Sequence, residues 1–289
     1  MTANLGWRQL PQGWMAYDES ASRCIAGFGW NWCRPWIYPL YTPAGRQVLQ
    51  EFPFDHPFHN GCFTGIHPVI HGDRSHNFWA TPPQRSVEDS LLQNLGRVTL
   101  SAPPELSVVR DELHALLQLE WTGCHGEPLL YERRSLRIQS GGIANQIHIH
   151  CHLTACVALT LPRTKFAGVG VRLDPALSAL GEGRYAQVWG LRKNDLQAVE
   201  AWVSSAKSVL DVSACDATML HGQALEAACF ESAKREGGYG LLIHEVFPKV
   251  PWFVRDYGLV LLNALQMRDE VLSGGDSFTW TATLAAYDR

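Results

Sequence analysis

Apolar and polar residues alternate with a period of two through the middle of the chain, which is the pattern of strands buried on one face. In residues 146–153, for example, Ile147, Ile149 and Cys151 alternate with polar residues. Segments rich in proline and glycine separate the alternating runs. The pattern predicts strands over residues 97–101, 106–110, 113–121, 129–139 and 146–155. Short strands with such breaks indicate an antiparallel sandwich or barrel.

The same pattern continues towards both ends of the chain. It predicts further strands over residues 14–17, 24–28, 165–173, 199–204, 240–246, 258–263 and 277–286. Residues 223–234 are an exception, because Leu225, Ala228 and Cys229 recur at helical spacing and predict a short helix. No linker-like segment interrupts the strands, so we expect a single all-β domain over residues 1–289.

The composition suits a protein with a large hydrophobic core. Hydrophobic residues make up 46% of the 289 residues and charged residues 18%, below the share of about 25% in average proteins. The net charge of −4 argues against a basic footprint for nucleic acid. No apolar run approaches the length of about 18 residues that spans a bilayer, and the first residues show no signal-peptide pattern. We therefore expect a soluble, cytoplasmic protein that binds neither nucleic acid nor membrane.

The eight cysteines are scattered, and no C-x-x-C pair indicates a zinc ribbon or a thioredoxin-type site. We interpret them as small buried hydrophobic residues in a reducing compartment. The chain has no G-x-G-x-x-G, P-loop, G-x-S-x-G or H-E-x-x-H motif. This absence argues against nucleotide binding and against the commoner hydrolase and zinc-protease chemistries.

Residues 34–65 contain the most distinctive group of side chains that can act in catalysis. Asp55, His56 and His59 lie close together, between and beside prolines that prevent a regular helix or a central strand. A histidine exchanges a proton near neutral pH, and a carboxylate fixes its tautomer and raises its basicity. The stretch therefore predicts one wall of a catalytic site. The alternative is a structural loop, braced by hydrogen bonds from its histidines to the backbone.

Residues 146–153 place three histidines on one face of a predicted strand. His148, His150 and His152 alternate with apolar residues, so their side chains share a face. An H-x-H pair can present imidazole ligands to a metal. His148 and His152 lie about 13 Å apart in an extended strand, so at most two of the three bind one ion. His148 and His150 are the candidates, completed by the histidines of the earlier stretch. The alternative is a polar, partly solvated sheet face.

A second candidate stretch follows far along the chain, where an apolar strand ends at His244. Arg255 offers a planar fork of donors to a polar ligand, and Trp252 offers a flat apolar face with one N–H. Tyr257 follows closely. We interpret this stretch as a second wall of the same site. The alternative is a surface pair of Arg255 and Asp256 beside buried rings.

Two long stretches resemble the PmoA-like family of bacterial proteins, whose automatic name is methane oxygenase. They read RPWIYPLYTPAGRQVLQEFPFDHPFHNG and, far downstream, GYGLLIHEVFPKVPWFVRDYGLVLLN. Between them, KFAGVGVRL resembles the glycine-rich strand of the family and contains Arg172. The chain departs from the family pattern at Phe58 and Asn60, where the family has histidine and arginine. The late D-H-P of the family is Ile-His-Glu here, which keeps only His244.

The resemblance implies an antiparallel β-sandwich of the galactose-mutarotase-like kind with few short helices. In that fold class, histidines, a carboxylate and an arginine on one sheet face act on sugar rings. We therefore expect a carbohydrate-active enzyme of the epimerase, lyase or hydratase type, with a small-molecule carbohydrate as its partner. The expected catalytic residues are His56, His59, His244 and Glu132, and the expected substrate-binding residues are Arg34, Tyr38, Asp55, Trp79, Arg172, Trp252, Arg255 and Tyr257.

In this hypothesis His56 or His59 is the general acid or base and His244 is its partner. Arg34 anchors the ligand, Glu132 serves as a second acid, and no cofactor is required. One alternative is an oxygenase or lyase that depends on a divalent metal held by the H-x-H strand. Another is a sugar-binding protein without catalytic activity.

Overall fold

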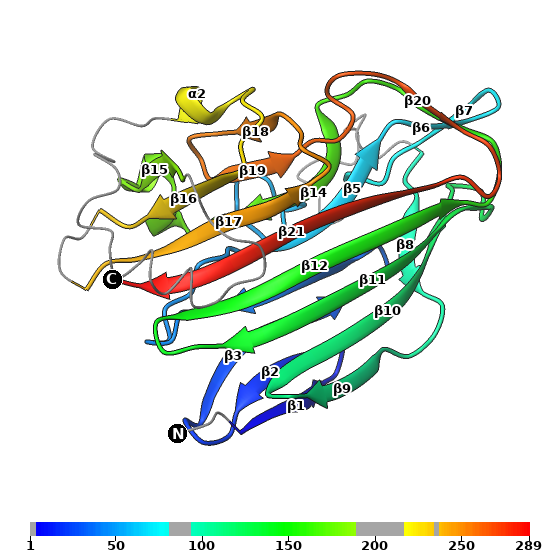
Figure 1. The fold of residues 1–289 in the computed structure, drawn as a ribbon. Coiled ribbons are helices and arrows are strands. Elements are labelled where there is room, and N and C mark those ends of the chain that lie inside the picture. Colours follow the sequence, from blue (N-terminus) through cyan, green and yellow to red (C-terminus); the bar gives the residue numbers. More distant parts are fainter. Residues whose placement is uncertain (1–3, 81–93, 189–216, 234–236) are drawn as a thin grey trace.

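Two large antiparallel sheets and a small third sheet form the part of the chain that the structure, a computed structural model, describes (Figure 1). This part comprises residues 4–80, 94–188, 217–233 and 237–289. The first large sheet has eight strands, in the order β1 (Leu5–Leu10), β2 (Gly13–Asp18), β3 (Arg23–Trp30), β4 (Pro35–Leu40), β5 (Cys62–His67), β14 (Phe166–Arg172), β19 (Leu259–Leu262) and β18 (Trp252–Val254).

The second large sheet has nine strands and contains the longest ones. Its order is β15 (Arg184–Gln187), β16 (Ala227–Glu231), β17 (Tyr239–Phe247), β21 (Ser277–Asp288), β12 (Ala144–Ala155), β11 (Pro128–Ser140), β10 (Glu112–Thr122) and β8 (Arg97–Leu100), and β9 (Glu105–Val109) also pairs with β10. Its long strands β10, β11, β12, β21 and β17 run side by side across the front of the molecule (Figure 1).

The small sheet and the helices complete the described elements. The small sheet has the order β20 (Glu270–Leu272), β13 (Leu159–Leu161), β6 (Val69–His71) and β7 (Arg74–His76). The helical elements are the 3-10 turns η2 (Pro175–Leu177) and η3 (Ala179–Gly181) and the short helix α2 (Ala217–Leu220). None of the described helices is long and apolar enough to span a membrane.

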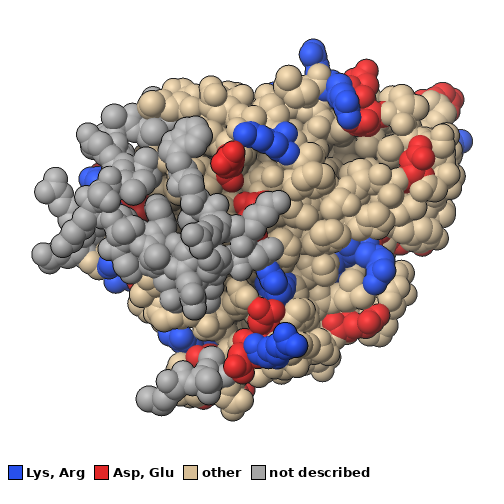
Figure 2. All heavy atoms as spheres, viewed as in Figure 1, with Lys and Arg blue, Asp and Glu red and all other residues tan. Residues whose placement is uncertain are grey.

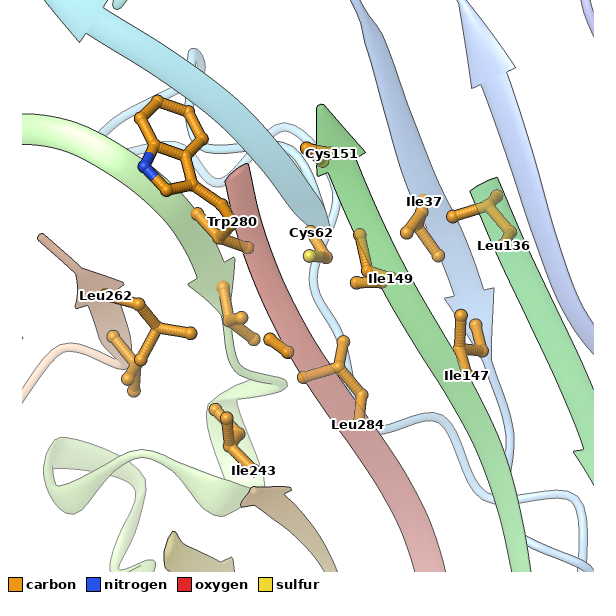
Figure 3. Close-up of a cluster of buried hydrophobic side chains, with 14 of the residues drawn as sticks. Ile37, Cys62, Leu136, Ile147, Ile149, Cys151, Ile243, Leu262, Trp280 and Leu284 are labelled. Atoms are coloured by element: carbon orange, nitrogen blue, oxygen red, sulfur yellow. The ribbon is translucent and has the colours of Figure 1, made fainter. Parts of the chain in front are cut away.

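The core lies between the two large sheets, and the period-two pattern creates it. Buried and accessible residues alternate along β10, β11 and β12. Ile147, Ile149 and Cys151 of β12 point inward and meet Ile37 and Cys62 of the other sheet (Figure 3). Burial of such side chains contributes about 25 cal/mol per Å² of apolar surface. The apolar face of each strand therefore fixes which face of the sheet is internal.

The structure confirms the predicted all-β class and the antiparallel sandwich. Each strand predicted within the described residues overlaps an observed one; the prediction 129–139, for example, corresponds to β11 and 277–286 to β21. The strand predicted at 199–204 lies outside the described residues. The helix predicted at 223–234 is wrong, because its centre forms strand β16. All five residues of β16 are buried. Apolar and polar residues therefore do not alternate along this strand, and the sequence pattern does not distinguish it from a helix.

The cysteines and the surface charges agree with the composition. The described cysteines are all free thiols, and Cys33, Cys62, Cys151 and Cys229 are buried. Burial raises the pKa of Cys62 to about 12, so this thiol is not ionised at neutral pH. Figure 2 shows positive and negative side chains interspersed on the face that it displays, with no extended patch of one sign among the described residues. The described part of this face therefore has no positively charged patch of the kind that binds nucleic acid.

Candidate functional site

The loop between β4 and β5 folds back on the eight-stranded sheet and carries the two histidines of the first candidate stretch. A tight turn joins them, in which the backbone N–H of His59 donates to the carbonyl of His56 at 2.9 Å. Gly61 then returns the chain to the sheet with a left-handed φ of 53°. A Cβ at Gly61 would lie 2.1 Å from the carbonyl oxygen of Ile37, so only glycine permits this close approach.

Four aromatic rings form a stack on the outer face of the eight-stranded sheet, and we call them the ring column. The ring of His56 lies between Tyr257, at 4.8 Å and 11°, and His59, at 4.9 Å and 9°. His59 in turn is parallel to Phe63, at 5.8 Å and 10°. Phe63 lies against β14, where a Cβ at Gly170 would be 2.5 Å from its ring. Glycine at this position therefore lets the column lie on the sheet.

Asp55 ties the ring column to the sheet through charged hydrogen bonds. One carboxylate oxygen lies 2.8 Å from Nδ1 of His56, and the other accepts from Nη2 of Arg172 at 2.8 Å. Burial raises the pKa of Asp55, but the hydrogen bond from His56 and the charge of Arg172 outweigh it and lower the pKa below its usual value. An ionised Asp55 accepts a hydrogen bond from Nδ1–H of His56, which leaves the lone pair on Nε2. This is the arrangement of a general base.

His59 is the buried member of the histidine pair. Its side chain is 2% exposed, and its Nδ1 has no hydrogen-bond partner among the described residues. Burial, followed by the nearby charges of His56, Arg172 and Arg34, lowers the pKa of His59 well below 6.5. His59 is therefore neutral at neutral pH and presents a ring with one N–H. The two stacked imidazoles do not both carry a charge.

The two histidines line a cavity of about 280 Å³, which we call the site cavity. Most of its wall is apolar or aromatic, and Lys165 and Arg255 add two cations. Its lining consists of His56, Phe58, His59, Trp79, Lys165, Phe166, Phe253, Arg255, Tyr257, Leu259 and Leu261. The volume is at the lower end of the range of about 300–1,000 Å³ for ligand pockets. It suits a ligand with a single ring.

The structure brings seven of the predicted site residues together. His56, His59, Trp79, Arg255 and Tyr257 line the site cavity, and Asp55 contacts His56 behind its wall. Arg172 lies beside them, with its guanidinium 4.9 Å from the ring centroid of Tyr257. The first candidate stretch and the late Arg-x-Tyr segment therefore do meet, as the sequence predicts. Tyr38 of β4 is not part of the lining.

Arg34, which was expected to anchor the ligand, is buried and does not line the site cavity. It is 1% exposed and donates to the carbonyl oxygens of Trp79, at 2.9 Å, and of Phe58. Its guanidinium lies 4.1 Å from the ring centroid of Phe63, at the buried end of the ring column. Burial lowers the pKa of Arg34 to about 9. This arginine joins the backbone segments that flank the cavity.

Trp252 is also placed differently from the prediction. It is fully buried in the core between the large sheets, whereas Phe253, the next residue of β18, lines the site cavity. Successive residues of a strand point to opposite faces, so only one of the two can reach the cavity. The sequence identifies the right segment, and the register of β18 decides which ring serves the site.

Glu132 lies in the core and not in the site cavity, which corrects its prediction as a second acid. Its carboxylate accepts from Nε1 of Trp121 at 2.8 Å and from Nε of Arg134 at 2.7 Å. Arg134 also donates to the hydroxyl of Thr64 on the opposite sheet. The role of Glu132 is to neutralise a buried arginine.

His244 lies on the outer face of the nine-stranded sheet, so the expected pairing with His59 in one site is wrong. In the register of the sheet, His244 lies opposite Thr283, and Thr283 lies opposite His148. His148 makes a 2.8 Å hydrogen bond to the Thr283 hydroxyl. His148 and His150 line a separate cavity of about 650 Å³ on this face. The core separates them from His56 and His59, so no ion joins the H-x-H strand to the first candidate stretch.

The buried His244 makes stability depend on pH. Burial lowers its pKa from 6.5 to about 4, with both ring nitrogens unpartnered among the described residues. The unfolded chain binds a proton below pH 6.5 and the folded chain does not, so this contribution is complete above pH 6.5 and is lost as the pH falls towards 4. We expect His244→Leu to reduce the loss of unfolding free energy between pH 7 and 4.5 by about 2–3 kcal/mol, measured by urea unfolding.

The control for this prediction is Ile243→Val, which shortens the buried neighbour of His244 in β17 and changes no titratable group. This variant should keep the pH dependence of the wild type. An unchanged pH dependence in His244→Leu would show that the ring of His244 binds a proton as readily in the folded chain as in the unfolded one.

Several residues that line the site cavity were not predicted from the sequence. Phe58 packs edge-on against His59 at 4.6 Å and closes the wall with an apolar ring. Lys165 and Phe166 begin the glycine-rich strand, and Leu259 follows the late Arg-x-Tyr segment. Each missed residue is adjacent to a predicted stretch. Their positions were available in the sequence, but which of them face outward was not.

Comparison with known families and structures gives the chain a family but no described activity. One family model, described as a family of unknown function (DUF6807), matches residues 29–289. The chain belongs to this family. The description does not carry the PmoA-like name, so that resemblance stays a prediction. No curated protein matches this DUF6807 chain in sequence.

Solved structures similar to the DUF6807 chain include enzymes that act on carbohydrates. A galactose 1-epimerase from Lactobacillus acidophilus NCFM is 9% identical over 99% of both chains, with a TM-score of 0.45. A galactose mutarotase related enzyme from Lactobacillus acidophilus is 6% identical over 98% of this chain and 97% of its own, with a TM-score of 0.36. A polysaccharide lyase is 11% identical over 99% of this chain and 32% of its own, with a TM-score of 0.34. The assignment of a function therefore rests on the geometry of the site.

Proposed function

We propose that this chain is an enzyme that moves a proton on a sugar acid bound in the site cavity. The observation that carries the proposal is the Asp55–His56 pair, whose imidazole is stacked on a neutral His59 at the cavity wall. A histidine held by a carboxylate and a second histidine of lowered pKa are the groups that proton transfer requires. The reaction type would be that of an isomerase or a lyase.

The two cations of the cavity favour an oxidised sugar over a neutral one. Lys165 and Arg255 line the same cavity as the histidines, and none of the described lining residues carries a carboxylate. A sugar carboxylate would pair with these cations, and the aromatic rings would contact the apolar C–H faces of the sugar ring. A neutral sugar would leave both cations without an anion.

The proposed step is removal of the proton on the carbon next to the sugar carboxylate. Nε2 of His56 takes this proton, while Nδ1 keeps its hydrogen bond to Asp55, which stabilises the imidazolium. The electrons of the C–H bond move into the carboxylate as an enediolate, and Lys165 and Arg255 stabilise its negative charge. His59 donates its ring N–H to an oxygen of the reacting group. Return of a proton to the opposite face of the enediolate gives an epimer, whereas loss of a hydroxyl or alkoxy group from the next carbon, protonated by the His56 imidazolium as it leaves, gives an unsaturated product.

A second candidate is a sugar-binding protein without catalytic activity. It is favoured by the five aromatic rings among the lining residues, Phe58, Trp79, Phe166, Phe253 and Tyr257, which suffice to bind a sugar ring. In that case His56 and His59 only donate and accept hydrogen bonds.

Solvent exchange separates the two candidates. The protein is incubated in D₂O with neutral sugars and with sugar acids, and proton NMR follows the C–H signal next to the carboxylate. We expect this signal to disappear for at least one sugar acid, with or without a new product. Binding without exchange over hours would favour the sugar-binding protein. If no sugar and no sugar acid binds, the proposed ligand class is wrong.

A further inference from the structure

The β6–β7 hairpin of the small sheet carries a second cluster of polar side chains, distinct from the ring column. His71 ends β6, His76 ends β7, and the loop between β10 and β11 brings Glu127 to them. One ligand atom from each of the three lies within 4.8 Å of the others. No other group of three histidine, cysteine or acidic side chains in the described part of the chain meets this criterion. None of the three lines the site cavity.

Two atoms of this cluster are buried and have no hydrogen-bond partner among the described residues. They are Nε2 of His76, a residue that is 0% exposed, and Oε1 of Glu127. The distance between them is 3.6 Å, which is too long for a hydrogen bond. Two ligands bound at about 2.1 Å to one tetrahedral ion are about 3.4 Å apart. The 3.6 Å between the two atoms therefore fits two ligands of one cation better than a direct hydrogen bond.

The loop geometry fixes Glu127 in this orientation. Its Oε2 accepts from the backbone N–H of His125 at 3.0 Å, which leaves Oε1 directed at His76. The backbone N–H of Gly123 donates to the carbonyl of Glu127 at 2.7 Å and closes the loop. A Cβ at Gly123 would lie 2.6 Å from the Glu127 carboxyl carbon and 2.9 Å from Nδ1 of His76. Glycine thus permits the loop to pack directly over both side chains.

Cys124 supports the second nitrogen of His76. Its backbone N–H donates to Nδ1 at 3.3 Å, and its sulfur lies 3.5 Å from the same atom. A metal on Nε2 leaves the ring proton on Nδ1, where the sulfur accepts it. Metal-binding histidines are commonly oriented by a hydrogen bond from the other ring nitrogen. The contact with the backbone N–H is lost in that state.

We propose that His71, His76 and Glu127 bind one divalent first-row transition metal. Two imidazoles and one carboxylate are a ligand set of zinc sites and of iron(II) sites, and three protein ligands leave a position for water. The ion would connect the hairpin of the small sheet to a loop of the nine-stranded sheet. It would therefore increase stability as well as provide a reactive centre.

Zinc binding to the full chain tests the proposal. Untagged protein is stripped with a chelator, titrated with Zn²⁺ by calorimetry and checked by elemental analysis. We expect one equivalent of zinc and a rise in Tm of about 5 °C at saturating zinc. We expect His76→Ala and Glu127→Gln each to weaken zinc binding about 100-fold and to remove the rise in Tm.

Two further variants make the outcome decisive. His71→Ala changes a partly exposed ligand, so it reports on binding even if the buried His76→Ala fails to fold, and it should also weaken zinc binding. His150→Ala is the matched control, because it removes a histidine of the H-x-H strand on the nine-stranded sheet. It should leave zinc binding unchanged. The proposal is overturned if the wild type binds less than about 0.1 equivalent of zinc, or if binding depends on His150 and not on His71 and Glu127.

Discussion

Replacement of His56 by alanine is expected to lower kcat/KM for the responding sugar acid by about 10³-fold. The reason is that the Nε2 lone pair of His56 is the base in the proposed step, and Asp55 holds it in the required tautomer at 2.8 Å. Asp55→Asn should cause a smaller loss, because it keeps a hydrogen-bonding side chain but removes the charge that stabilises the imidazolium. The measurement is the initial rate of solvent exchange by NMR.

The control for this prediction is His150→Ala, which changes a histidine on the other large sheet and should leave the exchange rate unchanged. Ligand affinity is measured alongside the rate, because the ring column also shapes the cavity. If His56→Ala binds the ligand normally and exchanges the proton at the wild-type rate, His56 is not the base. If it no longer binds the ligand, Asp55→Asn gives the informative comparison, since this variant keeps all four rings of the column.

Replacement of Arg134 by methionine is expected to destabilise the protein by about 3–5 kcal/mol. The Glu132 carboxylate is 1% exposed and lies 2.7 Å from Arg134 in the core, so the variant leaves a buried carboxylate without its cation. Thr64 on the opposite sheet also loses its hydrogen bond from Arg134. Urea unfolding at neutral pH gives the change in unfolding free energy.

The double variant Glu132→Gln/Arg134→Met is the control for this effect. It removes both charges and keeps an oxygen that accepts the hydrogen bond from Trp121. Because an unpaired buried charge costs more than a missing ion pair, the double variant should be more stable than Arg134→Met alone. A cost below about 1 kcal/mol for Arg134→Met, or a double variant less stable than the single one, would contradict this account of the core.

The positions of the arginines illustrate what a linear motif can and cannot predict. Arg34 and Arg255 both lie in segments that the sequence marks as functional, and both were expected to bind the ligand. Arg255 lines the site cavity, but Arg34 is buried behind it and donates to two backbone carbonyls. Both roles need a planar donor with several N–H groups. The residue type is therefore the same for the two roles, and only the three-dimensional position distinguishes them.

The histidines also show that residues of one candidate site in the sequence can lie far apart in the structure. His56 and His59 are neighbours in sequence and stay together in the ring column, because a tight turn of local residues joins them. His244 was grouped with them because it lies in the second candidate stretch. Its strand β17 joins the nine-stranded sheet, whereas β18, a few residues later, joins the eight-stranded sheet. A stretch of chain that passes from one sheet to the other cannot contribute all its side chains to one site.

The sequence by itself determined the long alternating strands, the two segments that meet at the site and the turn that holds the histidine pair. These features depend on local physics, namely the period of two, the proline and glycine breaks, and the contacts of residues close in the chain. The tertiary structure alone decided the sheet that each strand joins and the ring that faces the cavity, as with Trp252 and Phe253. It also assembled His71, His76 and Glu127. These outcomes depend on packing between distant segments, which no local pattern encodes.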